Sequence, residues 1–213
     1  RDRRVKFLKE ESGASFVPFL YVNCTGVQNN GKNIITFDGG STVYNANGDP
    51  IKFSREPYLE ELIIVSDFNA PEIRRVEKSR IAQKYDAIIA GIRHVKEMVG
   101  ASSHPRYVIG MSGGVDSAVV AALLSLAVGP EKVLGINMPT QYNSGKTKEA
   151  AARVAAKLGI AYDVIPIEAL VEANEKLLNL VNADGTGRGV DSLTLENLQA
   201  KIRGTSILSN LAG

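Results

Sequence analysis

Short apolar segments separated by turn residues fill the first third of the chain, a pattern that is typical of β structure. We expect strands over residues 16–23, 33–37, 42–45, 51–53 and 62–65. The sequence Asn47-Gly48-Asp49 lies between the third and fourth of these segments and predicts a β-hairpin. A small sheet with one uncovered face needs another element to pack on. We therefore expect this region to be part of a larger unit.

Beyond this region the apolar spacing changes. Apolar residues recur every three or four positions up to about Gly100, which predicts one long amphipathic helix. Further along, we expect strands over residues 107–111, 133–138 and 162–167, alternating with helices over residues 117–128, 147–158, 168–181 and 195–211. This alternation predicts an α/β fold, a parallel sheet with crossover helices. We therefore divide the chain into residues 1–70, a connecting helix over residues 71–104, and residues 105–213.

Charge and cysteine content narrow the class of protein. The chain has 25 Lys and Arg against 23 Asp and Glu, and a net charge of +2. This surplus is too small to attract nucleic acid or a membrane surface, so we expect neither partner. The longest apolar runs, such as residues 118–128, are well short of the roughly 20 residues that cross a bilayer. The single cysteine, Cys24, excludes an intrachain disulfide framework and fits a cytoplasmic location.

The segment with the most chemistry lies where a predicted strand meets a predicted helix. It reads Gly110-Met111-Ser112-Gly113-Gly114-Val115-Asp116-Ser117. At such a turn, unpaired backbone N–H groups point at one spot, and the helix dipole adds about half a positive charge. The glycines let a phosphate approach the backbone, and the serines add hydroxyl donors. Asp116 would repel a phosphate, so it either holds a Mg²⁺ that bridges to phosphate oxygens or caps local amides.

The glycine-containing segments also have other interpretations. The segment at residues 110–117 could be a plain helix entry, in which Asp116 only caps and the glycines only turn. Gly145-Lys146-Thr147 is similar to the end of a Walker A loop, but that motif needs a glycine five positions earlier, where Thr140 stands. The glycines of residues 185–189 follow no strand and are spaced differently from a dinucleotide fingerprint.

The loop resembles the pyrophosphate-binding loop of the ATP pyrophosphatases, a superfamily that includes GMP synthetase and asparagine synthetase. Three further sets of residues narrow the resemblance. They are Asn137-Met138-Pro139-Thr140 with Tyr142 and Ser144, the run from Glu196 to Gly204, and Tyr21-Val22-Asn23 followed by Phe37-Asp38-Gly39-Gly40-Ser41. Together they resemble the family of glutamine-dependent NAD⁺ synthetases.

The resemblance implies a fold. Residues 105–213 would form the front of an ATP-pyrophosphatase domain of the adenine nucleotide alpha hydrolase-like kind, and residues 1–70 the β-rich tail of a nitrilase-like α+β sandwich. The chain would then be an internal fragment. No glutaminase catalytic residue is identifiable in it, and Cys24 follows a strand beyond the position of the family's nucleophile, so we expect a buried, inert thiol.

The resemblance also implies a set of site residues. ATP and pyrophosphate would contact Gly110, Met111, Ser112, Gly113, Gly114, Val115, Asp116 and Ser117. Asp116 would be the Mg²⁺ ligand, and Asn197 and Arg203 would bind deamido-NAD⁺. On pattern alone these last two residues would belong to the solvent face of a helix. Adenine would lie near Met138-Pro139, and Lys201 stands where the family has an arginine.

The implied reaction is an AMP-forming ligation with ATP as cosubstrate. The carboxylate of deamido-NAD⁺ attacks ATP, an adenylate and pyrophosphate form, and ammonia from glutamine then displaces AMP to give NAD⁺. The protein partners would be other copies of itself, in a homo-oligomer. Two alternatives stay open: an ATP pyrophosphatase of the GMP-synthetase type, and a truncated chain that binds nucleotide without turnover. We expect the 213-residue chain alone to show little or no turnover.

Overall fold

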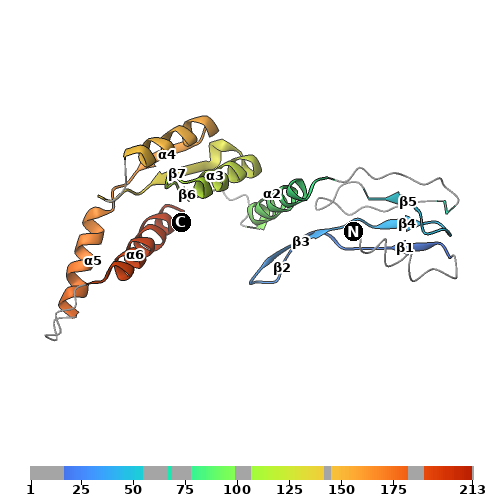
Figure 1. The fold of residues 1–213 in the computed structure, drawn as a ribbon, viewed down its shortest axis with the longest axis horizontal. Coiled ribbons are helices and arrows are strands. Elements are labelled where there is room, and N and C mark those ends of the chain that lie inside the picture. The colour runs from blue at the N-terminus through green and yellow to red at the C-terminus, as the bar shows by residue number, and fades with distance from the viewer. Residues whose placement is uncertain are drawn as a thin grey trace. The chain divides into compact units, whose positions relative to one another are not determined.

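The structure, a computed structural model, describes residues 17–54, 67–68, 78–98, 107–141, 145–181 and 190–212. The chain divides into two compact units, Arg1–Val95 and Lys96–Gly213 (Figure 1). Each is described by itself below. The domain boundaries proposed from the sequence, at residues 70 and 104, stay predictions.

The first unit contains two small antiparallel sheets. Strands β1 (Phe19–Tyr21), β4 (Thr42–Tyr44) and β5 (Pro50–Phe53) form one sheet in the order β1-β4-β5. Strands β2 (Thr25–Asn29) and β3 (Ile34–Asp38) form a separate two-stranded sheet. The rings of Phe19 and Tyr44 stack with centroids 4.5 Å apart and connect β1 to β4.

The hairpin predicted around Asn47-Gly48-Asp49 is confirmed. It joins β4 to β5, which pair antiparallel. The side-chain oxygen of Asn45 accepts hydrogen bonds from the backbone N–H groups of Asn47 and Asp49, both at 2.9 Å. Gly48 has φ +76°, a conformation that glycine adopts without steric cost. Strand β2 was not expected from the sequence, and the strand expected at residues 62–65 lies outside the described residues. Cys24, expected to be buried, is exposed just before β2, so that expectation was wrong.

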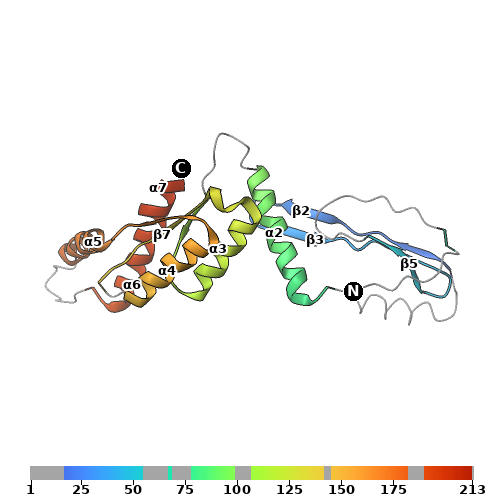
Figure 2. The ribbon, with the colours of Figure 1, turned by 90° about the horizontal axis from the view of Figure 1, so that it is seen from above.

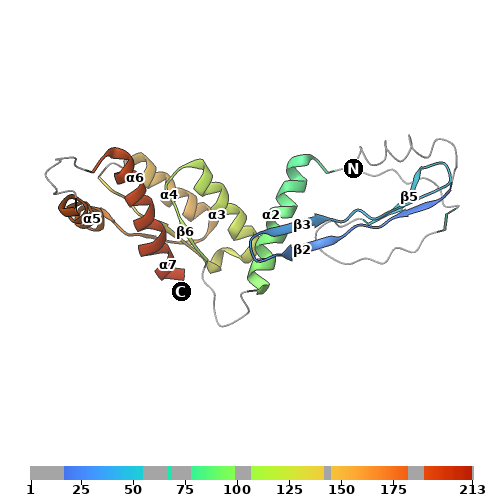
Figure 3. The ribbon, with the colours of Figure 1, turned by 90° about the horizontal axis from the view of Figure 1, so that it is seen from below.

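The long amphipathic helix predicted within residues 71–104 is present as α2 (Arg80–Met98). Ile89 and Ala90 are buried, and Gly91 brings the helix against the two-stranded sheet. A side-chain carbon at Gly91 would lie 3.8 Å from Ile34 Cγ2 and 3.9 Å from Thr36 Cγ2. Figure 3 shows α2 beside β2 and β3 within this unit.

The second unit is built on a three-stranded parallel sheet, which confirms the predicted α/β fold. The strands β6 (Tyr107–Gly110), β7 (Val133–Asn137) and β8 (Ala161–Val164) lie in the order β6-β7-β8. The helices are α3 (Val115–Val128), α4 (Gly145–Leu158), α5 (Glu168–Val181), α6 (Ser192–Lys201) and α7 (Ser209–Ala212). A short 3₁₀ turn, η1 (Pro130–Lys132), precedes β7. None of the described helices is both long and apolar enough to cross a membrane.

The sheet of the second unit is covered on both faces, with α4 and α6 on opposite sides of β7 (Figure 1). On one face, Ile136 and Met138 of the central strand region pack in a core cluster with Ile167, Val171 and Ile202. On the other face, helices α3 and α4 lie against the strands, with Ala121, Ala151 and Ala155 almost fully buried. The near-continuous apolar run Val133-Leu134-Gly135-Ile136 therefore accounts for the position of β7 between two helical layers.

The last helix differs from the expected single α-helix over residues 195–211. It begins earlier, at Ser192, and continues from α6 through a π-helical segment, η2 (Ile202–Leu208), into α7. Figure 2 shows α6 and α7 in one continuous run. In a π-helix the backbone hydrogen bonds join residues five apart, which brings their side chains closer in direction than in an α-helix. The pairs Ile202 with Ile207 and Arg203 with Leu208 are related in this manner.

Asp191 begins this helical run as its N-cap, and the expected effect of replacing it depends on pH. Its side chain accepts a hydrogen bond of 2.7 Å from the backbone N–H of Thr194, which lowers the pKa of Asp191 below its ordinary 3.8. The bond stabilises the folded state above the unfolded-state pKa, and this contribution is lost as the pH falls through the folded-state pKa. Thermal unfolding should show a lower Tm for Asp191→Ala than for the wild type at pH 7, and a difference that shrinks in acid. A difference that stays constant from pH 7 to pH 2 would contradict the ionised cap.

Candidate functional site

The candidate site is the loop between β6 and α3, at the carboxyl end of the first parallel strand. The backbone N–H of Met111 still donates to Ile136 O at 2.8 Å, so the loop leaves the sheet after Met111. Ser112 Oγ accepts from the backbone N–H of Gly114 at 3.2 Å and lies 3.2 Å from Ser117 Oγ. Ser117 Oγ donates to Gly114 O at 3.0 Å. The two serine hydroxyls therefore close the loop on itself and hold both ends of the turn.

The amino terminus of α3 is suited to an anion. Gly114 is the N-cap, with φ −83° and ψ 163°, and no side chain caps the helix. The first backbone N–H groups of a helix have no partner within it, and they carry the positive end of the helix dipole. The amides of the first turn, which starts at Val115, thus point out of the helix end beside the two hydroxyls. A phosphate is the ligand that this arrangement binds most readily.

Gly113 brings the loop into direct contact with α4. Its φ is +85°, and a side-chain carbon at this position would overlap the main-chain carbonyl group of Thr147. Thr147 lies in the first turn of α4, together with Gly145 and Lys146. This is the segment that is similar to the end of a Walker A loop but lacks the glycine that the motif needs five positions earlier. The structure places it against the loop, a proximity that the sequence pattern did not reveal.

Asp116 is exposed in the first turn of α3. No hydrogen bond or ion pair of its carboxylate is found within the described parts of the chain, and no group of three or more His, Cys, Asp or Glu gathers there. A single carboxylate is compatible with Mg²⁺, which keeps several waters and takes its other ligands from substrate phosphates. The donor set therefore fits the predicted metal, and the assignment of Asp116 stays a prediction.

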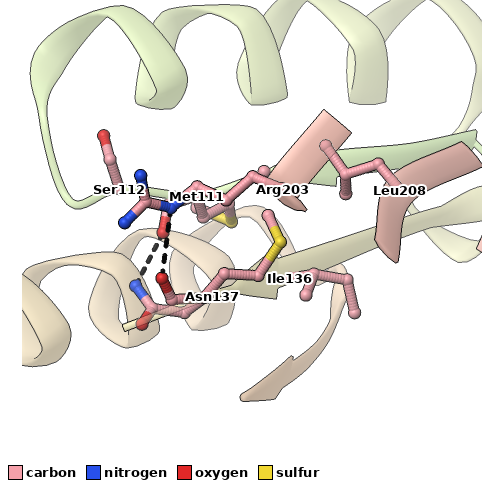
Figure 4. A pocket seen from close by; sticks show the side chains of 8 residues that line it. Met111, Ser112, Ile136, Asn137, Arg203 and Leu208 are labelled. Atoms are coloured by element: carbon pink, nitrogen blue, oxygen red, sulfur yellow. Dashed lines mark hydrogen bonds between the residues drawn. The ribbon is translucent and has the colours of Figure 1, made fainter. Parts of the chain in front are cut away.

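A pocket of about 300 Å³ lies next to the loop, at the carboxyl ends of β6 and β7 (Figure 4). Its lining residues are Gly110, Met111, Ser112, Ile136, Asn137, Met138, Arg203 and Leu208. Apolar side chains dominate, and Ser112, Asn137 and Arg203 supply the polar groups. Crevices at the carboxyl ends of parallel strands are the usual ligand sites of open α/β sheets.

Arg203 reaches this pocket from η2. Its Nε donates to Met138 O at 3.3 Å and its Nη2 to Gln199 Oε1 at 3.2 Å. Burial lowers the pKa of Arg203 below its ordinary range, but the guanidinium keeps its charge. Because η2 is π-helical, Leu208 faces the same pocket five residues later. A carbon added at Gly110 would lie 3.4 Å from Leu208 Cδ1, which places Leu208 over the end of β6.

The predicted site residues do not all meet. Gly110, Met111, Ser112 and Arg203 line one pocket, and the rest of the loop adjoins it. Asn197 is exposed on α6 and is not among the lining residues. Ile136 and Leu208 were not expected in the site, and Asn137 entered only through the family resemblance. The rule that ligands lie where neighbouring parallel strands end could have found Ile136 and Asn137, whereas no signal in the sequence pattern points to Leu208.

Comparison with known proteins identifies the family of the chain. The family model described as NAD synthase matches residues 87–212. The glutamine-dependent NAD(+) synthetase of Thermotoga maritima is 30% identical over an alignment 244 residues long. The alignment covers 97% of this chain and 40% of that protein. The NH(3)-dependent NAD(+) synthetase of Pyrococcus horikoshii is 45% identical over 105 residues, 49% of this chain and 38% of that protein.

Among solved structures, a glutamine-dependent NAD⁺ synthetase from Acinetobacter baumannii in complex with ADP matches with a TM-score of 0.77 and 28% identity. The match covers 100% of this chain and 39% of that chain. The chain therefore spans about two fifths of the length of these glutamine-dependent relatives. With a family model that matches more than half of its residues, the chain belongs to the NAD synthase family.

Proposed function

We propose that the second unit binds ATP through the loop at residues 110–117, and that the protein forms NAD⁺ by amidating deamido-NAD⁺. The observation that carries the proposal is the geometry of this loop in a chain of the NAD synthase family. Free helix-end amides and two serine hydroxyls converge beside a pocket large enough for part of a nucleotide. The relative from A. baumannii was solved with ADP, which supports an adenine nucleotide as the ligand.

The proposed chemistry needs no protein nucleophile. The carboxylate of deamido-NAD⁺ attacks the α-phosphorus of ATP, the bond from that phosphorus to the bridging oxygen breaks, and pyrophosphate leaves. Ammonia then attacks the acyl carbon of the adenylate and AMP departs. Negative charge spreads over phosphate oxygens in the first step, and preorganised amides stabilise such charge best. The loop would bind the pyrophosphate as it leaves.

Mg²⁺ would be held by the Asp116 carboxylate together with phosphate oxygens. When bound, the ion neutralises phosphate charge as it develops. As a ligand of the ion, the carboxylate would contribute to phosphate binding at a site whose other groups favour anions. Without the ion, its charge would oppose phosphate binding.

The pocket beside the loop would hold the base or ribose of a nucleotide. Its apolar walls are formed by Ile136, Met138 and Leu208 and suit a planar heterocycle. Arg203 would contribute a charged fork for a carboxylate or phosphate of deamido-NAD⁺, as the family resemblance implies. Its contact with the carbonyl of Met138 fixes the guanidinium at the rim.

The glutaminase function of the relatives is proposed for this protein on the same basis. Ammonia would come from glutamine hydrolysed elsewhere in the complete protein, since no residue of the described first unit is assigned to that reaction. We also propose that the protein forms a homo-oligomer in the cytoplasm.

The test is product analysis of the protein purified as its gene encodes it. Incubation with ATP, Mg²⁺, deamido-NAD⁺ and ammonium should yield NAD⁺, AMP and pyrophosphate in equal amounts, and glutamine should replace ammonium. Release of ADP and phosphate would contradict the adenylate route. Turnover with XMP in place of deamido-NAD⁺ would instead indicate a GMP-synthetase type. For the 213-residue chain, calorimetry should detect Mg²⁺-dependent ATP binding with little or no turnover.

A further inference from the structure

Asn137 is the last residue of β7 and lies beneath the loop. Its side chain is 5% exposed, and its Nδ2 donates to Met111 O at 2.7 Å (Figure 4). The other side-chain atom, Oδ1, is buried and has no hydrogen-bond partner within the described residues. An unpaired buried acceptor is costly, so such a group in a native structure calls for an explanation.

The bond that the same amide donates to Met111 O offsets this cost, and the register of the sheet shows why that bond is needed. Gly110 pairs with Ile136, and the last main-chain bond between the two strands runs from Met111 N–H to Ile136 O. In a parallel ladder that continued, the backbone N–H of Met138 would donate to Met111 O. The side-chain amide of Asn137 takes that acceptor instead. Met111 is 2% exposed, so its carbonyl would otherwise lack a partner away from water.

We propose that Asn137 is a positioning residue, whose side-chain amide replaces one ladder bond so that β6 and β7 separate while Met111 stays fixed ahead of the phosphate loop. The inference rests on the proposed function, because the loop is taken as the pyrophosphate site.

The replacement of a main-chain bond by the side-chain bond of Asn137 has consequences at both strand ends. Separation after Met111 opens the pocket that Gly110, Ser112 and Met138 line. The carbonyl of Met138 is bound by Arg203, and the carbonyl of Asn137 accepts from Ile165 N–H at 2.8 Å on the β8 side. Asn137 is therefore held by the sheet through its backbone and holds the loop through its side chain. The anchor of the loop is as rigid as the central strand.

The test uses two variants and a matched control in the 213-residue chain. Asn137→Leu keeps the branching and the number of side-chain heavy atoms and removes the donor, and Asn137→Ser keeps a polar group too short to reach Met111. The serine variant is measured if the leucine variant fails to fold. The control is Ser125→Ala. Ser125 is 7% exposed and donates to Ala121 O at 2.7 Å. The control variant therefore loses an equally buried bond within α3, away from the loop.

Hydrogen exchange and pyrophosphate binding are the two readouts. In Asn137→Leu, exchange of the hydrogen-bonded amides of Met111 and Gly114 should be about tenfold faster than in the wild type, because the buried bond that holds the start of the loop is lost. Exchange in β8 should not change, whereas a merely structural role would accelerate both segments. The affinity for inorganic pyrophosphate, measured by calorimetry with Mg²⁺, should fall by about tenfold. The control should change neither quantity.

Unchanged exchange at the amides of Met111 and Gly114 overturns the inference, whatever the ligand data show. If the wild type binds pyrophosphate, an unchanged affinity in Asn137→Leu overturns it as well. If the wild type fails to bind both pyrophosphate and ATP, the proposed function fails, and exchange still decides whether Asn137 holds the loop.

Discussion

Replacing Gly113 with alanine should weaken ATP and pyrophosphate binding by roughly a hundredfold. Two costs combine at this position. The left-handed conformation, with φ +85°, costs an L-residue about 1–2 kcal/mol, and a close-packed overlap costs about 1–3 kcal/mol more. The overlap is with the main-chain carbonyl of Thr147, which belongs to a helix and has little freedom to move. The free loop of the variant can relieve both costs by leaving this conformation, and ligand binding must restore it, so a combined cost of about 3 kcal/mol lowers the affinity by the expected factor.

Gly159 offers a control that separates the two costs. Its φ is +68°, and nothing lies within 4 Å of the position where a side-chain carbon would stand. Gly159→Ala should therefore lower stability through backbone strain alone and leave ATP and pyrophosphate affinity unchanged. Calorimetric titration of both variants, with Tm measured beside it, checks the expectation. Equal affinities in Gly113→Ala and Gly159→Ala would show that the contact between the loop and α4 is unimportant for binding.

The alternation of elements in the second unit could be predicted because each element satisfies a local rule. The helix expected at residues 168–181 is found as α5 with the same bounds, since its apolar positions follow the helical period and Glu168 stands in the first turn. The position of the loop could be predicted because glycine and serine residues between a strand and a helix are typical of an anion-binding turn. A parallel sheet follows from that alternation with little further information.

Elements that depend on their partners could not be predicted. Strand β2 reads Thr-Gly-Val-Gln-Asn and carries no apolar alternation, so its extended form depends on pairing with β3. The π-helical turn in η2 is likewise absent from the local pattern. Residues 203 and 208 would face different sides of an α-helix, and only the π geometry brings Arg203 and Leu208 to one pocket.

The candidate site was predictable where its residues are adjacent in sequence and unpredictable where they are distant. The segment from Gly110 to Ser117 can be recognised from its glycine and serine residues alone. Thr147 and Asn137 meet the loop only through the sheet, at sequence separations of 34 and 26 residues from Gly113 and Met111. The family resemblance added Arg203, which a helical pattern alone would have assigned to solvent.

The second large effect is expected at Asp116, and its sign should reverse with the metal. In Asp116→Asn, ATP binding in the presence of Mg²⁺ should weaken by about 30-fold, the scale of a lost contact to a charged group. In excess EDTA the same variant should bind ATP more tightly than the wild type, because a negative charge beside the phosphates has been removed. Glu172→Gln, which removes an exposed carboxylate from α5, is the control and should change neither affinity. A residue that only caps amides would give a small loss under both conditions. The crossing of the two titrations therefore separates a metal ligand from a cap, and equal binding of wild type and Asp116→Asn in Mg²⁺ would remove Asp116 from the site.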